Sequence, residues 1–357
     1  MAWVPRLDIW FHAHRNRGTL PKELDGMTLR QAEKYLGMAH SARDAVVFRR
    51  LYNGGVEERF FRGGNRIVQR YATPLGETEA ISRLTEDAER NEMLPIPTEF
   101  FLRQEKDYEI MRYVVEHTRY EPNYAAYAAY DADVGEDGLP MVPLGPCPFH
   151  LLLLAWAGYE SFYYHLADWP EAVRGLLEAL NKSYRQMWEV VAASPAKFLM
   201  HGEHFSGQLT PPPVFKKHFL PYFKEFNAVM HAAGKKVCFH ADADLTGLLD
   251  LALECDFDAA DCFACAPLVD TTFDEARRVW GERIVIWGGL PSLLLEDSFT
   301  FDEFREYVEE LYAKTAGQPA FILAISDNIM PAARFDRLLW IRDFLEEQAR
   351  SPSRTVR

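Results

Sequence analysis

The feature that most constrains the fold is a series of five short apolar runs in the second half of the chain, each followed by a longer segment with helical periodicity. The runs cover residues 196–202, 236–242, 258–267, 283–289 and 320–326. The helical segments cover residues 213–234, 245–255, 272–281, 300–317 and the stretch from about 333. Short strands that alternate with helices predict βαβ units and a parallel sheet.

So many consecutive strands favour a (β/α)8 TIM barrel over an open sheet, because the barrel repeats the strand–helix unit without interruption. Residues 5–14 and 140–147 are expected to supply earlier strands of the barrel. The second half of the chain therefore predicts an α/β barrel whose remaining strands lie in the first half.

The first half also contains material of a different kind. Residues 56–81 alternate in polarity and carry Gly-Gly and Pro-Leu-Gly turns, which predict a β-hairpin insertion. Residues 103–122 predict an amphipathic surface helix. We expect residues 1–350 to form a single barrel domain with these N-terminal helical and β-hairpin insertions, followed by a polar tail at 351–357.

Charge and cysteine content narrow the class of protein. The chain has 53 acidic and 39 basic side chains, a net charge of −14, which disfavours nucleic acid and anionic membranes as partners. No apolar run approaches the roughly 20 residues that cross a bilayer, and the N-terminus lacks the order of a signal peptide. Five cysteines are an odd number, so free thiols in a reducing compartment are expected, and with them a cytoplasmic location.

Candidate functional residues follow the apolar runs, because the active site of a parallel barrel lies at the carboxyl ends of its strands. The positions are His12, His14 and Arg15; Glu203 and His204; His240, Asp242 and Asp244; Cys262 and Cys265; and Ser326, Asp327 and Asn328. Histidines and carboxylates that converge from several strands are the ligands of zinc or another divalent ion. The sequence therefore predicts a divalent metal site, with zinc as the first choice.

Each of these positions also has a structural explanation. Asp244 precedes a helix and is expected to be its N-cap, and Asp327 is as well suited to cap a turn as to bind a ligand. Cys262 and Cys265 are expected to be small buried apolar residues rather than ligands. Alternation along the strand points His240 and Asp242 to the same side, which favours a functional role for His240.

Three segments carry a resemblance to a known family. Residues 211–261, "PPPVFKKHFLPYFKEFNAVMHAAGKKVCFHADADLTGLLDLALECDFDAAD", resemble the uroporphyrinogen decarboxylase superfamily, as do "RIVIWGGLP" at 283–291 and "FILAISDNIMP" at 321–331. "TPLGE" at 73–77 is similar to a turn of its less characterised branches. The resemblance implies a (β/α)8 barrel, in agreement with the rhythm of strands and helices.

The resemblance implies two kinds of chemistry. The decarboxylase branch has arginines after its first strand that hold substrate carboxylates, and the matching stretch here is "WFHAHRNRGTLPKE", residues 10–23. Trp10, Leu20 and Pro21 match, and Arg15 and Arg17 are the candidates to bind an anionic group. A metal-free decarboxylase or lyase is therefore the alternative function.

The other branch holds cobalamin-dependent methyltransferases, which bind zinc through a histidine and two cysteines. His240 matches the histidine, whereas Asp242 and Asp327 stand where the cysteines would be, and Glu203 completes the expected metal ligands. This harder set suits zinc, manganese or iron. The function so implied is a metal-assisted methyltransferase that moves a methyl group between a small substrate and a corrinoid protein.

Further roles follow from that expectation. Catalysis is assigned to Glu203, His204 and His240, with Glu203 or His204 managing protons. The substrate is expected to contact His12, His14, Arg15, Arg17, Trp10, Phe11, Phe205 and Trp287. The corrinoid is expected on a separate partner protein, because the chain has no D-x-H-x-x-G motif, and the family implies a homodimer. A barrel that binds a ligand without turnover is the third alternative.

Overall fold

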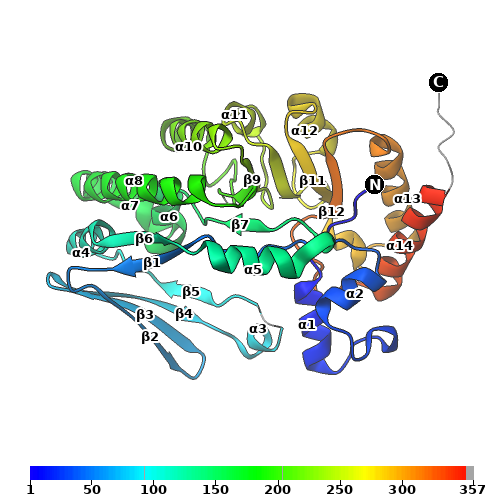
Figure 1. The fold of residues 1–357 in the computed structure, drawn as a ribbon, viewed down its shortest axis with the longest axis horizontal. Coiled ribbons are helices and arrows are strands. Elements are labelled where there is room, and N and C mark those ends of the chain that lie inside the picture. Colours follow the sequence, from blue (N-terminus) through cyan, green and yellow to red (C-terminus); the bar gives the residue numbers. More distant parts are fainter. Residues whose placement is uncertain (92, 203, 351–357) are drawn as a thin grey trace.

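The computed structural model describes residues 1–91, 93–202 and 204–350, and its centre is a parallel sheet of six strands (Figure 1). The order is β12-β11-β10-β9-β8-β7. The strands are β7 (Met141–Pro143), β8 (Phe198–Met200), β9 (Lys236–His240), β10 (Ala259–Phe263), β11 (Val285–Leu290) and β12 (Phe321–Ile325). The five runs predicted as strands in the second half are thus confirmed, and with them the parallel α/β sheet.

Helices cover the outer side of this sheet (Figure 1). They are α8 (Pro170–Ala193), α10 (Leu220–Ala232), α11 (Leu249–Glu254), α12 (Phe273–Trp280), α13 (Phe301–Thr315) and α14 (Phe335–Arg350). Thr272 and Thr300 begin two of them with capping boxes that satisfy the first backbone N–H groups. The fully buried rings of Phe205, Phe219 and Phe239 pack in the core between strands and helices.

Two irregular segments, residues 2–4 and 39–42, form backbone hydrogen bonds between the two edge strands of the sheet, β12 and β7. The backbone contacts are Leu323 N to Ala2 O (3.0 Å), Val4 N to Leu323 O (2.9 Å), Ala39 N to Trp3 O (2.9 Å) and Met141 N to Ala42 O (2.8 Å). A path of backbone hydrogen bonds therefore leads from β12 through residues 2–4 and 39–42 to β7.

The strand predicted at residues 5–14 is wrong, because α1 (Asp8–Arg17) occupies most of that segment. Leu7, Trp10, Phe11 and His14 follow one another at helical spacing, and the first three are buried on one side. The strand-like pairing lies earlier in the chain, at Trp3. The segment at 140–147, in contrast, does contain the predicted strand, β7.

The N-terminal insertions form a separate layer beside the barrel sheet (Figure 1). The predicted hairpin segment 56–81 lies in an antiparallel sheet of β2 (Glu57–Gly63), β3 (Arg66–Thr73), β4 (Gly76–Arg83) and β5 (Ile96–Glu99). The helix predicted at 103–122 is shorter than expected: α4 (Glu105–Glu116) ends before β6 (Thr118–Pro122), which pairs with β1 (Phe48–Tyr52). Pairing of β6 with β1 replaces the last helical turns.

The remaining helices connect these parts. They are α2 (Leu29–Tyr35), α3 (Glu86–Arg90), α5 (Tyr124–Val134), α6 (Pro148–Leu151), α7 (Tyr159–Asp168) and α9 (Pro212–Val214). Throughout the described part of the chain, every helix is too short or too polar to cross a bilayer. The tail predicted at 351–357 lies outside the described residues.

His201, which follows β8, makes stability depend on pH. It is fully buried, its Nδ1 lies 2.7 Å from Gly145 O and its Nε2 lies 2.8 Å from the Tyr222 hydroxyl. Burial lowers the pKa of His201 to about 4, so the unfolded chain binds this proton more readily below about pH 6.5. We expect the unfolding free energy to fall as pH drops from 6.5 to 4, with His201 contributing up to about 1.4 kcal/mol per pH unit.

Urea unfolding at several pH values tests this expectation in the wild type and in His201→Gln. The variant loses some stability at pH 7 because its buried hydrogen bonds change, but its unfolding free energy should vary less steeply with pH. Equal slopes for the two proteins would show that His201 does not contribute.

Candidate metal centre

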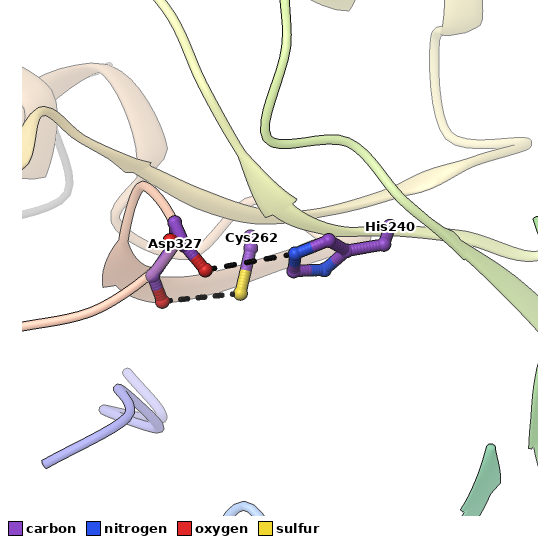
Figure 2. Close-up of side chains that lie close together, drawn as sticks. All are labelled: His240, Cys262 and Asp327. Atoms are coloured by element: carbon purple, nitrogen blue, oxygen red, sulfur yellow. Dashed lines mark hydrogen bonds and ion pairs between the residues drawn. The ribbon is translucent and has the colours of Figure 1, made fainter. Parts of the chain in front are cut away.

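Three potential metal ligands meet at the carboxyl ends of the barrel strands. His240 is the last residue of β9, Cys262 lies in β10, and Asp327 is the second residue after the end of β12. Each residue offers one ligand atom: an imidazole nitrogen, a thiol sulfur and a carboxylate oxygen. These three atoms all lie within 4.8 Å of one another. Figure 2 shows the three side chains directed toward one another. This is the edge of a parallel barrel at which active sites form.

Unusual backbone conformations direct two of these side chains into the group. The register of β10 shifts between Asp261 and Phe263, and Cys262 has a φ of 55°. Asp327 has a φ of 66°. A bulge re-aims a side chain, and positive φ in a residue other than glycine is a strained conformation found mainly at functional sites. Ser326 Oγ donates to Phe263 O at 3.0 Å and ties the ends of β12 and β10 together.

A buried carboxylate fixes the orientation of His240. Asp261 is fully buried, and its Oδ2 lies 3.0 Å from His240 Nδ1. Since the ionised carboxylate only accepts hydrogen bonds, Nδ1 carries the proton in this contact. Nε2 is then directed toward Asp327 Oδ1, 3.6 Å away. A carboxylate behind a histidine is the arrangement that orients metal-binding imidazoles in many metalloproteins.

Two arginines supply positive charge to the centre. Arg43 Nη2 donates to Asp261 Oδ1 and lies 3.2 Å from Cys262 Sγ. Arg6 Nη1 lies 3.3 Å from Asp327 Oδ1. Burial alone would raise the pKa of Asp261, but Arg43 and His240 together hold that pKa well below its usual range. The pKa of Asp327 is also lowered, because His240 and Arg6 offset its burial.

The pKa of His240 moves in the opposite direction. Burial lowers it, but the negative character of Cys262 and the hydrogen bonds to Asp261 and Asp327 outweigh burial and raise the pKa well above 6.5. In the metal-free protein His240 is therefore an imidazolium at neutral pH. The Nε2 proton occupies the position at which a bound ion would contact the ring.

Asp242 and His204 form a second polar pair beside His240. Asp242 Oδ2 lies 3.5 Å from His240 Nε2, and Asp242 Oδ1 lies 2.9 Å from His204 Nδ1. His204 has a φ of 53° and its side chain is 44% exposed, so it lies where a substrate can approach. Behind this pair, burial and the neighbouring His204 lower the pKa of His150 to about 3, which keeps that ring neutral.

The structure brings only some of the predicted ligands together. His240 and Asp327 belong to the group of three, and Asp242 lies beside it but contacts His204 more closely. Glu203 lies outside the described residues. Cys265, whose Sγ lies 3.5 Å from Gly289 O and 3.4 Å from the Tyr307 hydroxyl, is the small buried residue that the sequence predicted.

Residues expected to contact substrate fall into two groups. His12, His14, Arg15 and Arg17 lie on α1, which borders the loop carrying Asp327, because His14 Nε2 lies 3.1 Å from Pro331 O. Arg15 Nη2 lies 2.8 Å from His12 Nδ1. In contrast, Trp10, Phe11, Phe205 and Trp287 are buried.

Their contacts show what these rings do instead. Trp10 Nε1 donates to Ala333 O at 2.9 Å, and Phe205 packs among core phenylalanines. Trp287 lies inside the barrel, where its Nε1 donates to Val4 O at 2.9 Å. These three aromatic rings are thus held by contacts within the fold, and their expected role as walls of a substrate pocket stays a prediction.

Sequence reasoning missed Cys262 as a candidate ligand and overlooked Asp261, Arg43 and Arg6 altogether. Cys262 was expected to be a buried apolar residue, and it is buried, but the β10 bulge turns its sulfur toward His240 and Asp327. Asp261 carried a signal, because an aspartate within an apolar strand needs a buried partner. Arg43 comes from an irregular segment without a recognisable pattern, and Arg6 lies in the segment 5–14 that was predicted as a strand.

The donor atoms suit zinc. Imidazole nitrogen, thiolate sulfur and carboxylate oxygen all bind Zn²⁺, whereas the thiolate disfavours magnesium and calcium. Three protein ligands leave a tetrahedral ion one position for water or substrate, which is the pattern of catalytic rather than structural zinc. The residues present therefore fit a catalytic divalent ion.

Comparison with known proteins places the chain in a family. The uroporphyrinogen decarboxylase (URO-D) family matches residues 92–348, so the chain belongs to this family, and the predicted resemblance is confirmed. No curated protein matches the chain. Among solved structures, the chain is similar to a Listeria monocytogenes protein provisionally described as a vitamin-B12-independent methionine synthase. The identity is 14% and the TM-score 0.36, over 61% of this chain and 67% of that chain.

Proposed function

We propose that the protein is a metal-assisted methyltransferase that moves a methyl group between a small substrate and a corrinoid carried by a partner protein. The observation that supports this function most directly is the convergence of His240, Cys262 and Asp327 at the carboxyl ends of the strands. A soft sulfur ligand together with an oriented histidine matches zinc better than any other common divalent ion.

The bound ion would act as a Lewis acid on the heteroatom that gains or loses the methyl group. The chain's own residues have the other tasks. Asp261 holds His240 in place through Nδ1, and Arg6 holds the carboxylate of Asp327. His204, oriented by Asp242, would accept the proton that a thiol or alcohol acceptor loses as the new bond to carbon forms.

The substrate would approach across α1 and His204. The side chains of His12 and Arg15 on α1 are in contact with each other and are the candidates to bind a polar or anionic end of the substrate. The partner that carries the corrinoid would need to reach the same opening, since the methyl group is transferred at the carboxyl ends of the strands.

Metal analysis tests this function. Protein purified without chelator should contain about one equivalent of transition metal, and His240→Ala and Cys262→Ser should lose it, because each removes a direct ligand. His117→Ala, which changes a histidine on the insertion layer, should retain the metal. Metal-loaded protein should then transfer the methyl group of methylcobalamin to members of a panel of small thiols. The absorbance of the corrinoid measures this demethylation.

Absence of metal from the wild type, even after addition of zinc or manganese, would contradict the proposal. The second candidate, a metal-free decarboxylase, would then be favoured. It is supported by the raised pKa of His240, since an imidazolium can protonate a carbanion after loss of carbon dioxide. Arg15 and Arg17 would bind the substrate carboxylates, as the sequence resemblance implies.

A further inference from the structure

A cavity of about 540 Å³ opens at the amino ends of the barrel strands, opposite the metal centre. The first residues of four strands line it, together with Ile322, the second residue of β12; the four are Phe198, Lys236, Ala259 and Val285. Its volume falls within the range of about 300–1,000 Å³ that is typical of small-molecule sites. The proposed catalytic group plays no part in this cavity.

The interior of the cavity is apolar. Trp287 forms part of its wall, and the Phe198 ring lies nearly parallel to the Trp287 ring, at 22°, with the ring centroids 6.2 Å apart. The indole N–H of Trp287 is already bonded to Val4 O. Ala259 and Ile322 add only aliphatic surface, so the inner part of the cavity suits a hydrocarbon or aryl group without polar atoms.

The mouth of the cavity has more positive than negative charge. Lys197, Lys236 and Arg283 line it, against Asp258 and Glu282, in a chain whose net charge is −14. The Asp258 carboxylate is already engaged by Lys236 Nζ at 2.7 Å and by the backbone N–H of residue 237 at 2.8 Å. Arg283 Nη2 is likewise paired with Asp256 Oδ1, at 3.5 Å. Among the described residues, Lys197 is then the cation of the mouth without an ion pair, and it offers an anionic group a partner next to an interior that favours an apolar one.

We propose that this cavity binds a small carboxylate with an apolar aryl or alkyl body. The body lies against Trp287 and Ile322, and the carboxylate lies at the mouth beside Lys197. The described residues that line the cavity do not include those of the candidate metal centre, and the test of the proposal requires neither metal nor a reaction.

Calorimetric titration with 4-phenylbutyrate and with the uncharged 4-phenylbutan-1-ol tests the proposal. The wild type should bind both probes and should bind the carboxylate more tightly. Lys197→Gln should weaken binding of the carboxylate by about fivefold and leave the alcohol unchanged, as expected for the loss of one exposed charge pair. Lys182→Gln, an exposed lysine on α8, is the matched control and should bind both probes like the wild type.

A second variant tests the position of the apolar body. Ala259→Leu places three more carbon atoms in the cavity and should abolish binding of both probes, provided that circular dichroism shows a folded protein. Lys197 is exposed, so its variant keeps the test informative if Ala259→Leu does not fold. Absence of binding to the wild type at millimolar probe, or unchanged binding to a folded Ala259→Leu, would overturn the proposal.

One further outcome would also overturn it. If the wild type is a dimer in light scattering and folded Ala259→Leu is a monomer, the cavity receives a side chain of a second copy of this chain. If the wild type and folded Ala259→Leu have the same oligomeric mass, and the wild type binds the carboxylate, the small-molecule site is supported.

Discussion

Replacement of Asp261 by asparagine is expected to lower the unfolding free energy by about 3–5 kcal/mol, the typical cost of removing one partner from a buried ion pair. Asp261 is fully buried and accepts hydrogen bonds from Arg43 and His240. The Arg43 side chain is only 13% exposed, and its Nε has no hydrogen-bond partner among the described residues. Without the carboxylate, the guanidinium remains buried with its charge uncompensated.

Urea unfolding of four proteins separates this effect from simple loss of a contact. The proteins are the wild type, Asp261→Asn, Arg43→Met and the double variant. Because the two side chains share one interaction, the double variant should be destabilised by clearly less than the sum of the single variants. Asp133→Asn is the matched control, because Asp133 forms an exposed ion pair with Arg30 and its side chain is 70% exposed. This substitution should lower the unfolding free energy by less than about 1 kcal/mol. Additive effects of the Asp261 and Arg43 substitutions would contradict a stabilising interaction between the two side chains.

Zinc affinity is expected to rise at least tenfold for each pH unit near neutral pH, because the imidazolium and the thiol must each lose a proton before they bind the ion. The pKa of His240 is raised well above 6.5, because Cys262, Asp261 and Asp327 together outweigh its burial, which favours the protonated ring. The ion can bind only after Nε2 loses its proton, and displacement of one proton gives a tenfold change in apparent affinity per pH unit. Binding therefore strengthens as pH rises and weakens as it falls.

Competition of the protein with a zinc indicator at several pH values measures this slope. Calorimetry in two buffers of different ionisation enthalpy counts the protons released and should give at least one per zinc ion. Asp261→Asn, if it folds, should bind zinc with a shallower dependence on pH, because the imidazolium loses a stabilising acceptor. An affinity that is independent of pH in the wild type would show that His240 is not a ligand.

The second half of the fold could be predicted because its strands are buried on both sides. Such strands appear as short apolar runs, and β8 to β12 lie within the predicted runs except for Leu290, the last residue of β11, which follows its run. The first half is harder, since residues 5–14 satisfy the patterns of a strand and of a helix. The helical spacing of Leu7, Trp10 and Phe11 could have decided between them, because all three are buried on one side of the chain.

The candidate metal centre shows a different limit of prediction from sequence. His240 and Asp327 could be found because they follow predicted strands and match a family pattern. Cys262 could not, since its direction depends on a bulge and on a positive φ that a cysteine rarely adopts. Arg43 comes from a segment without periodic pattern, and only the folded chain brings it to Asp261.

The position of Trp287 connects the two ends of the barrel. One side of the indole takes part in the wall of the cavity, and the Arg43 guanidinium carbon lies 5.7 Å from the centre of the ring. Arg43 in turn contacts both Asp261 and Cys262. If a molecule in the cavity moved the indole and Arg43 with it, it would change the free energy of binding an ion. Thermodynamic reciprocity then requires the ion to change the affinity for that molecule by the same factor.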